Sequence, residues 1–222
     1  MPSVADWGLR DYSESLDAMR SLVRARRGGL VPDTLVLVEH PAVVTVGVEG
    51  DDGLAAASGL PVVAVERGGH ATYHGPGQQV GYPIVDLDAR ARDVRRFVRD
   101  VEEVIVRAVA PFGVRAGHVS GRPGVWVDGE RKIASIGIAV DHWVSFHGFA
   151  LNVDLDLAPF ERFRPCGFDG SVMTSLSREA GHRVVLGEVR PHLVNAWNQV
   201  FAPARDPADP SAFPAAKPLP PP

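Results

Sequence analysis

Residues 124–153, GVWVDGERKIASIGIAVDHWVSFHGFALNV, decide the fold of this chain. Runs rich in β-branched and aromatic residues occupy 124–127, 133–140 and 143–153, and the Asp128-Gly129 pair after the first run is typical of a tight hairpin turn. Consecutive strands with short connections predict an antiparallel meander. The middle of the chain is therefore expected to form a sheet.

Helices and further strands are expected on both sides of this meander. Outside the meander, strands are predicted at 34–39, 43–47, 62–65 and 80–85. Apolar residues at helical spacing predict helices at 13–27, 93–110, about 171–180 and 187–200. Ser13 is the candidate N-cap of the first helix. This order of elements predicts an α+β domain, with one mixed or antiparallel sheet flanked by helices.

The composition excludes several classes of protein. The chain has 222 residues, 45% of them hydrophobic, and a formal net charge of -4, so it lacks the basic excess of a nucleic-acid binder. No run of about 18 apolar residues predicts a membrane span, and the N-terminus has no secretory signal. We expect a cytoplasmic protein that contacts neither nucleic acid nor a membrane.

The C-terminal segment differs in composition from the rest of the chain. The last twenty residues contain eight prolines and few large apolar side chains, a composition that cannot build a packed core. We therefore expect a single catalytic domain over 1–202 and a disordered, proline-rich tail over 203–222.

A segment rich in glycine and polar residues, RGGHATYHGPGQ at 67–78, lies between two predicted strands. Glycines let backbone N–H groups approach a ligand closely, so this segment is a candidate binding loop rather than a mere turn. It lacks the Gly-Lys-Ser/Thr ending of a phosphate-binding loop, and it does not run from a strand into a helix as a dinucleotide fingerprint does. His70 and His74 are four apart, but the surrounding glycines and proline oppose the helix that a zinc motif needs. We expect neither a metal site nor a cofactor.

Cys166 is the only cysteine, and it stands between Pro165 and Gly167. A thiol in an open turn is suited to nucleophilic chemistry, yet a lone cysteine is often a small buried apolar residue, and its local context leaves both interpretations open. Lys132, at the start of an apolar strand, and His147 are candidates to stabilise its thiolate. Each has an ordinary alternative, a solvated lysine at a strand end and a satisfied core histidine.

Four blocks of sequence together resemble the lipoyl(octanoyl) transferase family of lipoate biosynthesis. They occur in the family's order and are RGGHATYHGPGQ, GVWVDGERKIASIGI, HGFALNVD and RPCGFDGSVMTSL. The resemblance implies a fold like the catalytic domain of the biotin and lipoate protein ligases. It also implies transfer of an octanoyl group, without a cofactor, from octanoyl-acyl carrier protein to a lysine of a lipoyl domain, through an acyl-cysteine. The implied acceptors are the lipoyl domains of 2-oxoacid dehydrogenase E2 subunits and the glycine cleavage H protein.

The resemblance also implies roles for individual residues. The family's nucleophile falls on Cys166, and the lysine that lowers its pKa falls on Lys132. The implied substrate-binding residues are Arg67, Gly68, Gly69, His70, Ala71, Thr72, Tyr73, His74, Ser135, Ile136, Gly137, Gly148, Phe149 and Ala150. Two alternatives remain at this stage: an ATP-dependent lipoate or biotin ligase, and a non-catalytic module that binds acyl carrier protein or lipoyl domains.

Overall fold

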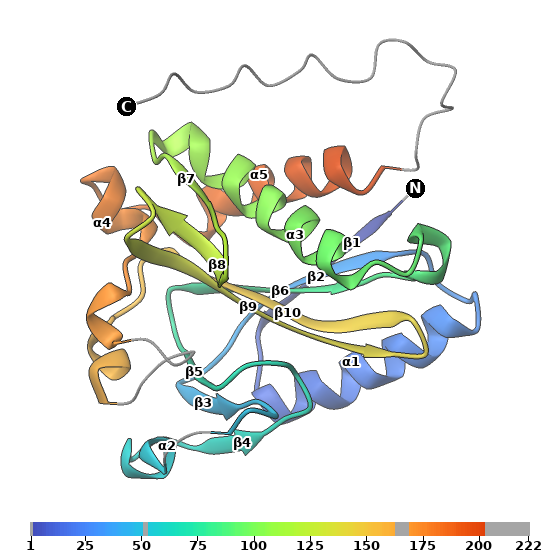
Figure 1. The fold of residues 1–222 in the computed structure, drawn as a ribbon, viewed down its shortest axis with the longest axis horizontal. Coiled ribbons are helices and arrows are strands. Elements are labelled where there is room, and N and C mark those ends of the chain that lie inside the picture. Colours follow the sequence, from blue (N-terminus) through green and yellow to red (C-terminus); the bar gives the residue numbers. More distant parts are fainter. Residues whose placement is uncertain (1, 51–52, 163–168, 203–222) are drawn as a thin grey trace.

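The computed structural model describes residues 2–50, 53–162 and 169–202 (Figure 1). Cys166 and the proline-rich segment 203–222 lie outside the described residues, so the predictions made for them remain predictions.

The main sheet has seven strands in the order β1-β2-β6-β10-β9-β8-β7. Their bounds are β1 Ser3–Leu9, β2 Thr34–Glu39, β6 Gln78–Ile84, β7 Ala116–Val119, β8 Arg122–Val127, β9 Arg131–Asp141 and β10 Val144–Asn152. The β1–β2 pair is parallel and the other pairs are antiparallel, so the sheet is mixed. The predicted meander is confirmed as β8, β9 and β10.

A second, smaller sheet lies beside the first. It has three strands in the order β4-β3-β5, with β3 at Val43–Val46, β4 at Val62–Ala64 and β5 at Ala71–His74. The expectation of one sheet is therefore wrong, and part of the predicted binding loop is strand β5. Because these strands have only three or four residues, they show too little alternation to reveal a second sheet in the sequence.

Helices cover both faces of the main sheet (Figure 1). The principal ones are α1 Tyr12–Arg27, α3 Val94–Val109 and α5 Leu186–Val200. Buried side chains of α1 pack with β6 and β10 in one apolar cluster, while those of α3 and α5 form a larger cluster on the opposite face. The α+β class with flanking helices is thus confirmed. Among the described residues, no helix is both long and apolar enough to cross a membrane.

The residues at which two helices begin differ from those predicted from the sequence. Asp11, not Ser13, caps α1: its Oδ1 accepts hydrogen bonds from the backbone N–H groups of Ser13 and Glu14 at 2.8 and 3.2 Å. The expected helix at 171–180 is the shorter α4, Leu176–Ala180, preceded by a 3-10 turn. The remaining short elements are α2 Leu54–Ala57 and the 3-10 turns η1 Asp88–Arg90, η2 Ala110–Phe112, η3 Ala158–Arg162 and η5 Gly170–Val172.

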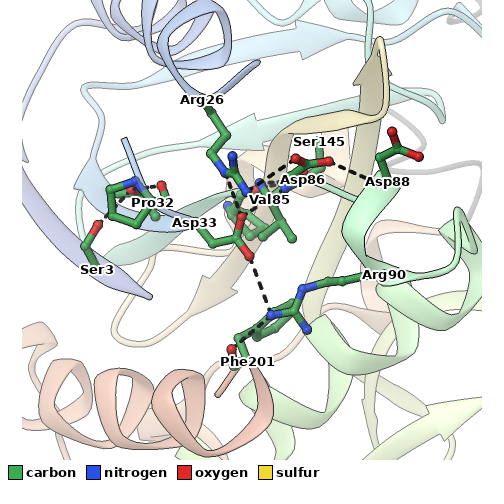
Figure 2. Close-up of polar contacts among 12 residues, drawn as sticks. Ser3, Arg26, Pro32, Asp33, Val85, Asp86, Asp88, Arg90, Ser145 and Phe201 are labelled. Carbon is green, nitrogen blue, oxygen red and sulfur yellow. Dashed lines mark hydrogen bonds and ion pairs between the residues drawn. The ribbon is translucent and has the colours of Figure 1, made fainter. Parts of the chain in front are cut away.

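A polar cluster centred on Asp33 ties several elements together (Figure 2). Its Oδ1 accepts hydrogen bonds from Arg26 Nε at 2.9 Å and from the Asp86 backbone N–H at 3.0 Å. Arg90 lies 3.5 Å from Asp33 Oδ2 and donates to the carbonyl of Phe201 at 2.9 Å. The cluster thereby joins α1, the start of β2, the end of β6 and the end of α5.

Candidate active site

A cavity of about 30 Å³ lies where the β9–β10 surface meets the small sheet and the first turn of α1. It is lined by Tyr12, Arg67, Thr72, His74, Val80, Tyr82, Ser135, Ile136, Gly137, His147, Gly148, Phe149 and Ala150. Apolar and polar side chains share its wall, as in many small-molecule sites.

The cavity brings together the three sequence segments that were predicted to bind substrate. The predicted residues that line it are Arg67, Thr72, His74, Ser135, Ile136, Gly137, Gly148, Phe149 and Ala150. They meet because β9 and β10 are neighbours, with Ser135 opposite Ala150 and Gly137 opposite Gly148. The first segment reaches them because the Gly68 N–H donates to the Ile138 carbonyl at 3.1 Å. Their role in binding remains a prediction.

The other predicted residues, Gly68, Gly69, His70, Ala71 and Tyr73, do not line the cavity. Alternation along strand β5 explains Ala71 and Tyr73, since neighbouring side chains in a strand point to opposite faces. Both pack in a third apolar cluster with Phe160 and Met173. The side chain of His70 is 41% exposed, and its Nε2 lies 3.2 Å from the carboxylate of Glu49.

Two buried histidines beside the cavity are held as neutral rings. His40 Nδ1 lies 2.7 Å from the Arg10 carbonyl, which can only accept, so its Nε2 must accept from the Tyr82 hydroxyl, also at 2.7 Å. His74 Nδ1 lies 2.8 Å from Gln78 Oε1. Burial lowers the pKa of His74 to about 3, with nearby His40 adding to the effect, and burial also lowers the pKa of His40. No local sequence signal indicated His40 or Tyr82 as residues of this site.

A chain of hydrogen bonds connects His74 with the strand that carries Lys132. Gln78 Nε2 donates to Asn152 Oδ1, and Asn152 Nδ2 donates to the Thr174 carbonyl, both at 2.9 Å. The Thr174 N–H then donates to the Lys132 carbonyl at 3.0 Å. The cavity and the start of β9 are therefore held in a fixed relation.

Lys132 is 1% exposed, which confirms that its side chain enters the core. Its Nζ lies 5.5 Å from the centre of the Trp126 ring. Gly124 leaves room for it: a Cβ there would lie 2.7 Å from Lys132 Cε, and the φ of +110° also favours glycine. The Gly124 N–H donates to Glu102 Oε1 at 3.3 Å. Burial raises the pKa of this carboxyl, while the Gly124 N–H and the positive charge of Lys132 oppose the rise.

His147 lines the cavity in an unusual backbone conformation. Its φ of +56° is rare for a residue with a side chain. The ring centre lies 4.8 Å from that of Phe146, the preceding residue in the strand, and both ring nitrogens lack a hydrogen-bond partner among the described residues. Burial lowers its pKa to about 4, although Glu66 opposes the effect.

Comparison with known proteins agrees with this fold. A family model, the lipoyl protein ligase A/B catalytic domain, matches residues 11–198. The octanoyltransferase of Geobacter sulfurreducens is 45% identical over 187 residues, covering 84% of this chain and 79% of the relative. The octanoyltransferase of Geotalea uraniireducens is 43% identical over 207 residues, or 92% and 96% of the two chains. A crystal structure of lipoate-protein ligase A bound with ATP superposes with a TM-score of 0.73 at 18% identity, covering 90% of this chain and 85% of that chain.

The fold and the family match thus define a catalytic domain of the lipoyl protein ligase A/B class. Within that class the chain belongs to the octanoyltransferase family, a group of acyltransferases. The family resemblance predicted from the four sequence blocks is confirmed.

Proposed function

We propose that this protein transfers an octanoyl group from octanoyl-acyl carrier protein to a lysine of a lipoyl domain, through a thioester on Cys166, in the cytoplasm. The observation that carries the proposal is the fully buried Lys132 in a member of the octanoyltransferase family, on the same strand, β9, as the cavity residues Ser135, Ile136 and Gly137. The acceptors we propose are the E2 lipoyl domains and the glycine cleavage H protein.

The chain that flanks Cys166 in sequence is anchored beside Lys132. The backbone of Met173 forms an isolated parallel β-bridge with that of Lys132, and the Met173 side chain packs in the same apolar cluster as Phe160. Gly170 fits against the carbonyl of Phe160, where a Cβ would lie only 2.2 Å away. These contacts support a role for Cys166 near Lys132.

In the first step, the Cys166 thiolate attacks the carbonyl carbon of the carrier thioester. A new carbon–sulfur bond forms, the bond to the carrier's thiol breaks, and the Lys132 ammonium supplies the proton to the departing thiolate. One thioester replaces another, so little driving force is needed. The cavity supplies apolar wall for the chain, and each CH₂ that it buries contributes about 0.8 kcal/mol.

In the second step, the acceptor's lysine amine attacks the acyl-cysteine carbonyl. An amide forms, Cys166 departs as a thiolate, and the Lys132 amine accepts the proton that the nucleophile loses. Lys132 thereby returns to its ammonium form. Because the amide is more stable than the thioester, this step drives the cycle forward.

Mass spectrometry with octanoyl-acyl carrier protein and no ATP tests this cycle. We expect the enzyme to gain one octanoyl group on the peptide that contains Cys166, and an added lipoyl domain to remove it. Cys166→Ser should abolish acylation, and Lys132→Met should lower kcat/KM about 10³-fold, the scale of a lost proton-transfer group.

Lys217→Met is the matched control, because Lys217 lies outside the part of the chain that the family model matches. It should leave the rate unchanged. An octanoyl group mapped to another residue would refute the cysteine intermediate, a strict requirement for ATP would indicate a ligase, and binding without turnover would indicate a non-catalytic module.

A further inference from the structure

We propose that Glu102 is a positioning residue for Lys132, and that its carboxylate holds the buried lysine side chain in place and in the ammonium form. This inference rests on the proposed function, because it takes Lys132 to serve the reaction at Cys166. Glu102 exchanges no proton with the substrate and acts only through Lys132.

Helix α3 brings Glu102 to the strands around Lys132. This helix packs over β7, β8 and β9 on one face of the main sheet (Figure 1). Glu102 follows the core residue Val101 and is only 8% exposed. Among the described residues it is the only carboxylate that is buried. Because carboxylates are almost never buried unless they are paired, a glutamate in this place requires partners.

Gly124 joins Glu102 to Lys132. Its backbone N–H donates to Glu102 Oε1 at 3.3 Å, and a Cβ on the same residue would lie 2.7 Å from Lys132 Cε and 3.4 Å from Lys132 Nζ. The residue that binds the carboxylate is therefore also the residue against which the end of the lysine lies. A carboxylate this close to an amine favours the charged form of the amine.

Lys132 needs such a counter-charge because its side chain is removed from water. Burial of an ammonium is costly unless an opposite charge or a polar partner compensates, and otherwise it favours the neutral amine. The Trp126 ring, 5.5 Å from Nζ, attracts the cation. Arg122 stacks on the same ring with its Cζ 3.7 Å from the centre, and this second positive charge disfavours the ammonium. The carboxylate of Glu102 offsets both burial and Arg122.

Two further basic groups act on the Glu102 carboxyl, His118 of β7 and Arg99 of α3. Burial is the largest influence on the pKa of this carboxyl and raises it, whereas the Gly124 N–H and these basic groups favour the ionised form. Neither His118 nor Arg99 can offer Lys132 a counter-charge. Glu102 is thus the acidic member of a group of basic side chains.

The acidic residue of α4, Glu179, has partners of its own. Its Oε1 accepts hydrogen bonds from Arg131 Nε at 2.8 Å and from Thr174 Oγ1 at 2.6 Å, and the bond from Arg131 is the main cause of its lowered pKa. Thr174 contacts Lys132 through the backbone, by the hydrogen bond to its carbonyl. The charge of Glu179 is therefore balanced by Arg131.

Nuclear magnetic resonance of the lysine side chains tests the pair without substrate. The chain has only two lysines, Lys132 and Lys217, so protein labelled with ¹³C at lysine Cε gives one signal for each. Glu102→Gln keeps an oxygen that can accept from the Gly124 N–H but removes the charge. It should lower the pKa of Lys132 by about one unit, and the titration of Lys217 should stay the same.

Glu103→Gln is the matched control. Glu103 is the next residue of α3, but it pairs with Arg107 at 2.7 Å and both side chains are exposed. This variant should leave the pKa of Lys132 unchanged, and Glu102→Asp, which retains the charge, should lower it less than Glu102→Gln does. Equal pKa values of Lys132 in the wild type and in folded Glu102→Gln overturn the proposal.

The wild type alone gives a second measurement, should Glu102→Gln not fold. Protonation of Glu102 should shift the Lys132 signal once more in acid, at a pH above the ordinary glutamate pKa of 4.5, because the pKa of Glu102 is raised. Glu179 titrates below that value and is thereby distinguished. A Lys132 signal that shows no such acid step overturns the proposal.

The pH dependence of octanoyl transfer connects the pair to the reaction. The first step uses the Lys132 ammonium, so kcat/KM should fall at alkaline pH, and in Glu102→Gln this fall should begin about one pH unit lower. A rate reduced by the same factor at every pH would indicate a merely structural role and overturn the proposal. If the wild type transfers no octanoyl group, the proposed function is wrong, but the pKa of Lys132 still tests its pairing with Glu102.

Discussion

Two polar clusters of the molecule, one at Asp33 and one at the cavity, differ in how completely their groups are paired. At Asp33, each carboxylate oxygen has a cationic partner, and none of the residues of this cluster lines the cavity (Figure 2). At the cavity, Thr72 Oγ1 and both nitrogens of His147 are buried without hydrogen-bond partners among the described residues. Satisfied polar groups support a fold, whereas unsatisfied ones at a cavity indicate a place for a ligand.

Removal of the Asp33 carboxylate should produce the largest change in stability. Asp33→Ala leaves Arg26 and Arg90 without their shared acceptor in a cluster where Asp33 is only 16% exposed. We expect a loss of about 2–4 kcal/mol in the free energy of unfolding, measured by urea denaturation. The kcat/KM of the folded enzyme for octanoyl transfer should not change.

Asp33→Asn is the matched control, because its amide oxygen can still accept from the Asp86 N–H and from Arg26. It should lose less stability than the alanine variant. A change of kcat/KM for octanoyl transfer in either folded variant would contradict the separation of the two clusters.

The neutral histidines of the cavity should make stability depend on pH. The pKa of His74 is lowered to about 3 in the folded state, against an ordinary value of 6.5. Below pH 6.5 the unfolded chain therefore binds a proton that the folded protein does not, and stability falls as pH falls. Between pH 6.5 and 5 the contribution of His74 amounts to about 2 kcal/mol, from 1.36 kcal/mol per pH unit.

His74→Asn tests this assignment, since its amide can replace Nδ1 as the donor to Gln78 but cannot take up a proton. Unfolding free energies measured from pH 7 to 5 should fall less steeply for this variant than for the wild type. The exposed His142, changed to Asn in the same way, is the control, and an equal change of slope in both variants would rule out burial as the cause.

The sequence predicted the long helices and strands better than the short ones. The meander and the helix at 93–110 have long, regular apolar patterns, and both were confirmed. Strand β1 was missed because Asp6 and Gly8 interrupt its weak, half-buried alternation. Strand β5 was taken as a loop because its four residues lie between glycines, and its cross-strand partner comes from β3.

The sequence predicted which residues form the site, but not the direction in which their side chains point. The motifs correctly grouped Arg67, Ser135 and Ala150, which line one cavity. They could not distinguish Thr72, which lines the cavity, from Tyr73, whose side chain points to the opposite face of the strand. The motifs also gave no reason to prefer the ordinary or the functional interpretation of His147. Its direction depends on a positive φ that tertiary contacts impose.

A pair of threonines repeats the contrast between the two clusters within one ladder. Thr45 and Thr72 are opposite each other in β3 and β5, and both are buried. Thr45 Oγ1 accepts from Arg67 at 3.0 Å, whereas Thr72 Oγ1 has no hydrogen-bond partner among the described residues. The same substitution therefore compares a satisfied with an unsatisfied hydroxyl in nearly the same position.

Thr45→Val should lower the free energy of unfolding by about 1–2 kcal/mol, because it leaves an Arg67 N–H with one acceptor fewer. Thr72→Val should leave that free energy unchanged or raise it by up to about 1 kcal/mol, because it removes a buried hydroxyl that lacks a partner. If the Thr72 hydroxyl contacts the acyl donor, its loss should also raise KM for octanoyl-acyl carrier protein while stability is kept. Equal destabilisation by the two substitutions would mean that Thr72 is a structural residue, and the contrast would then hold only for His147.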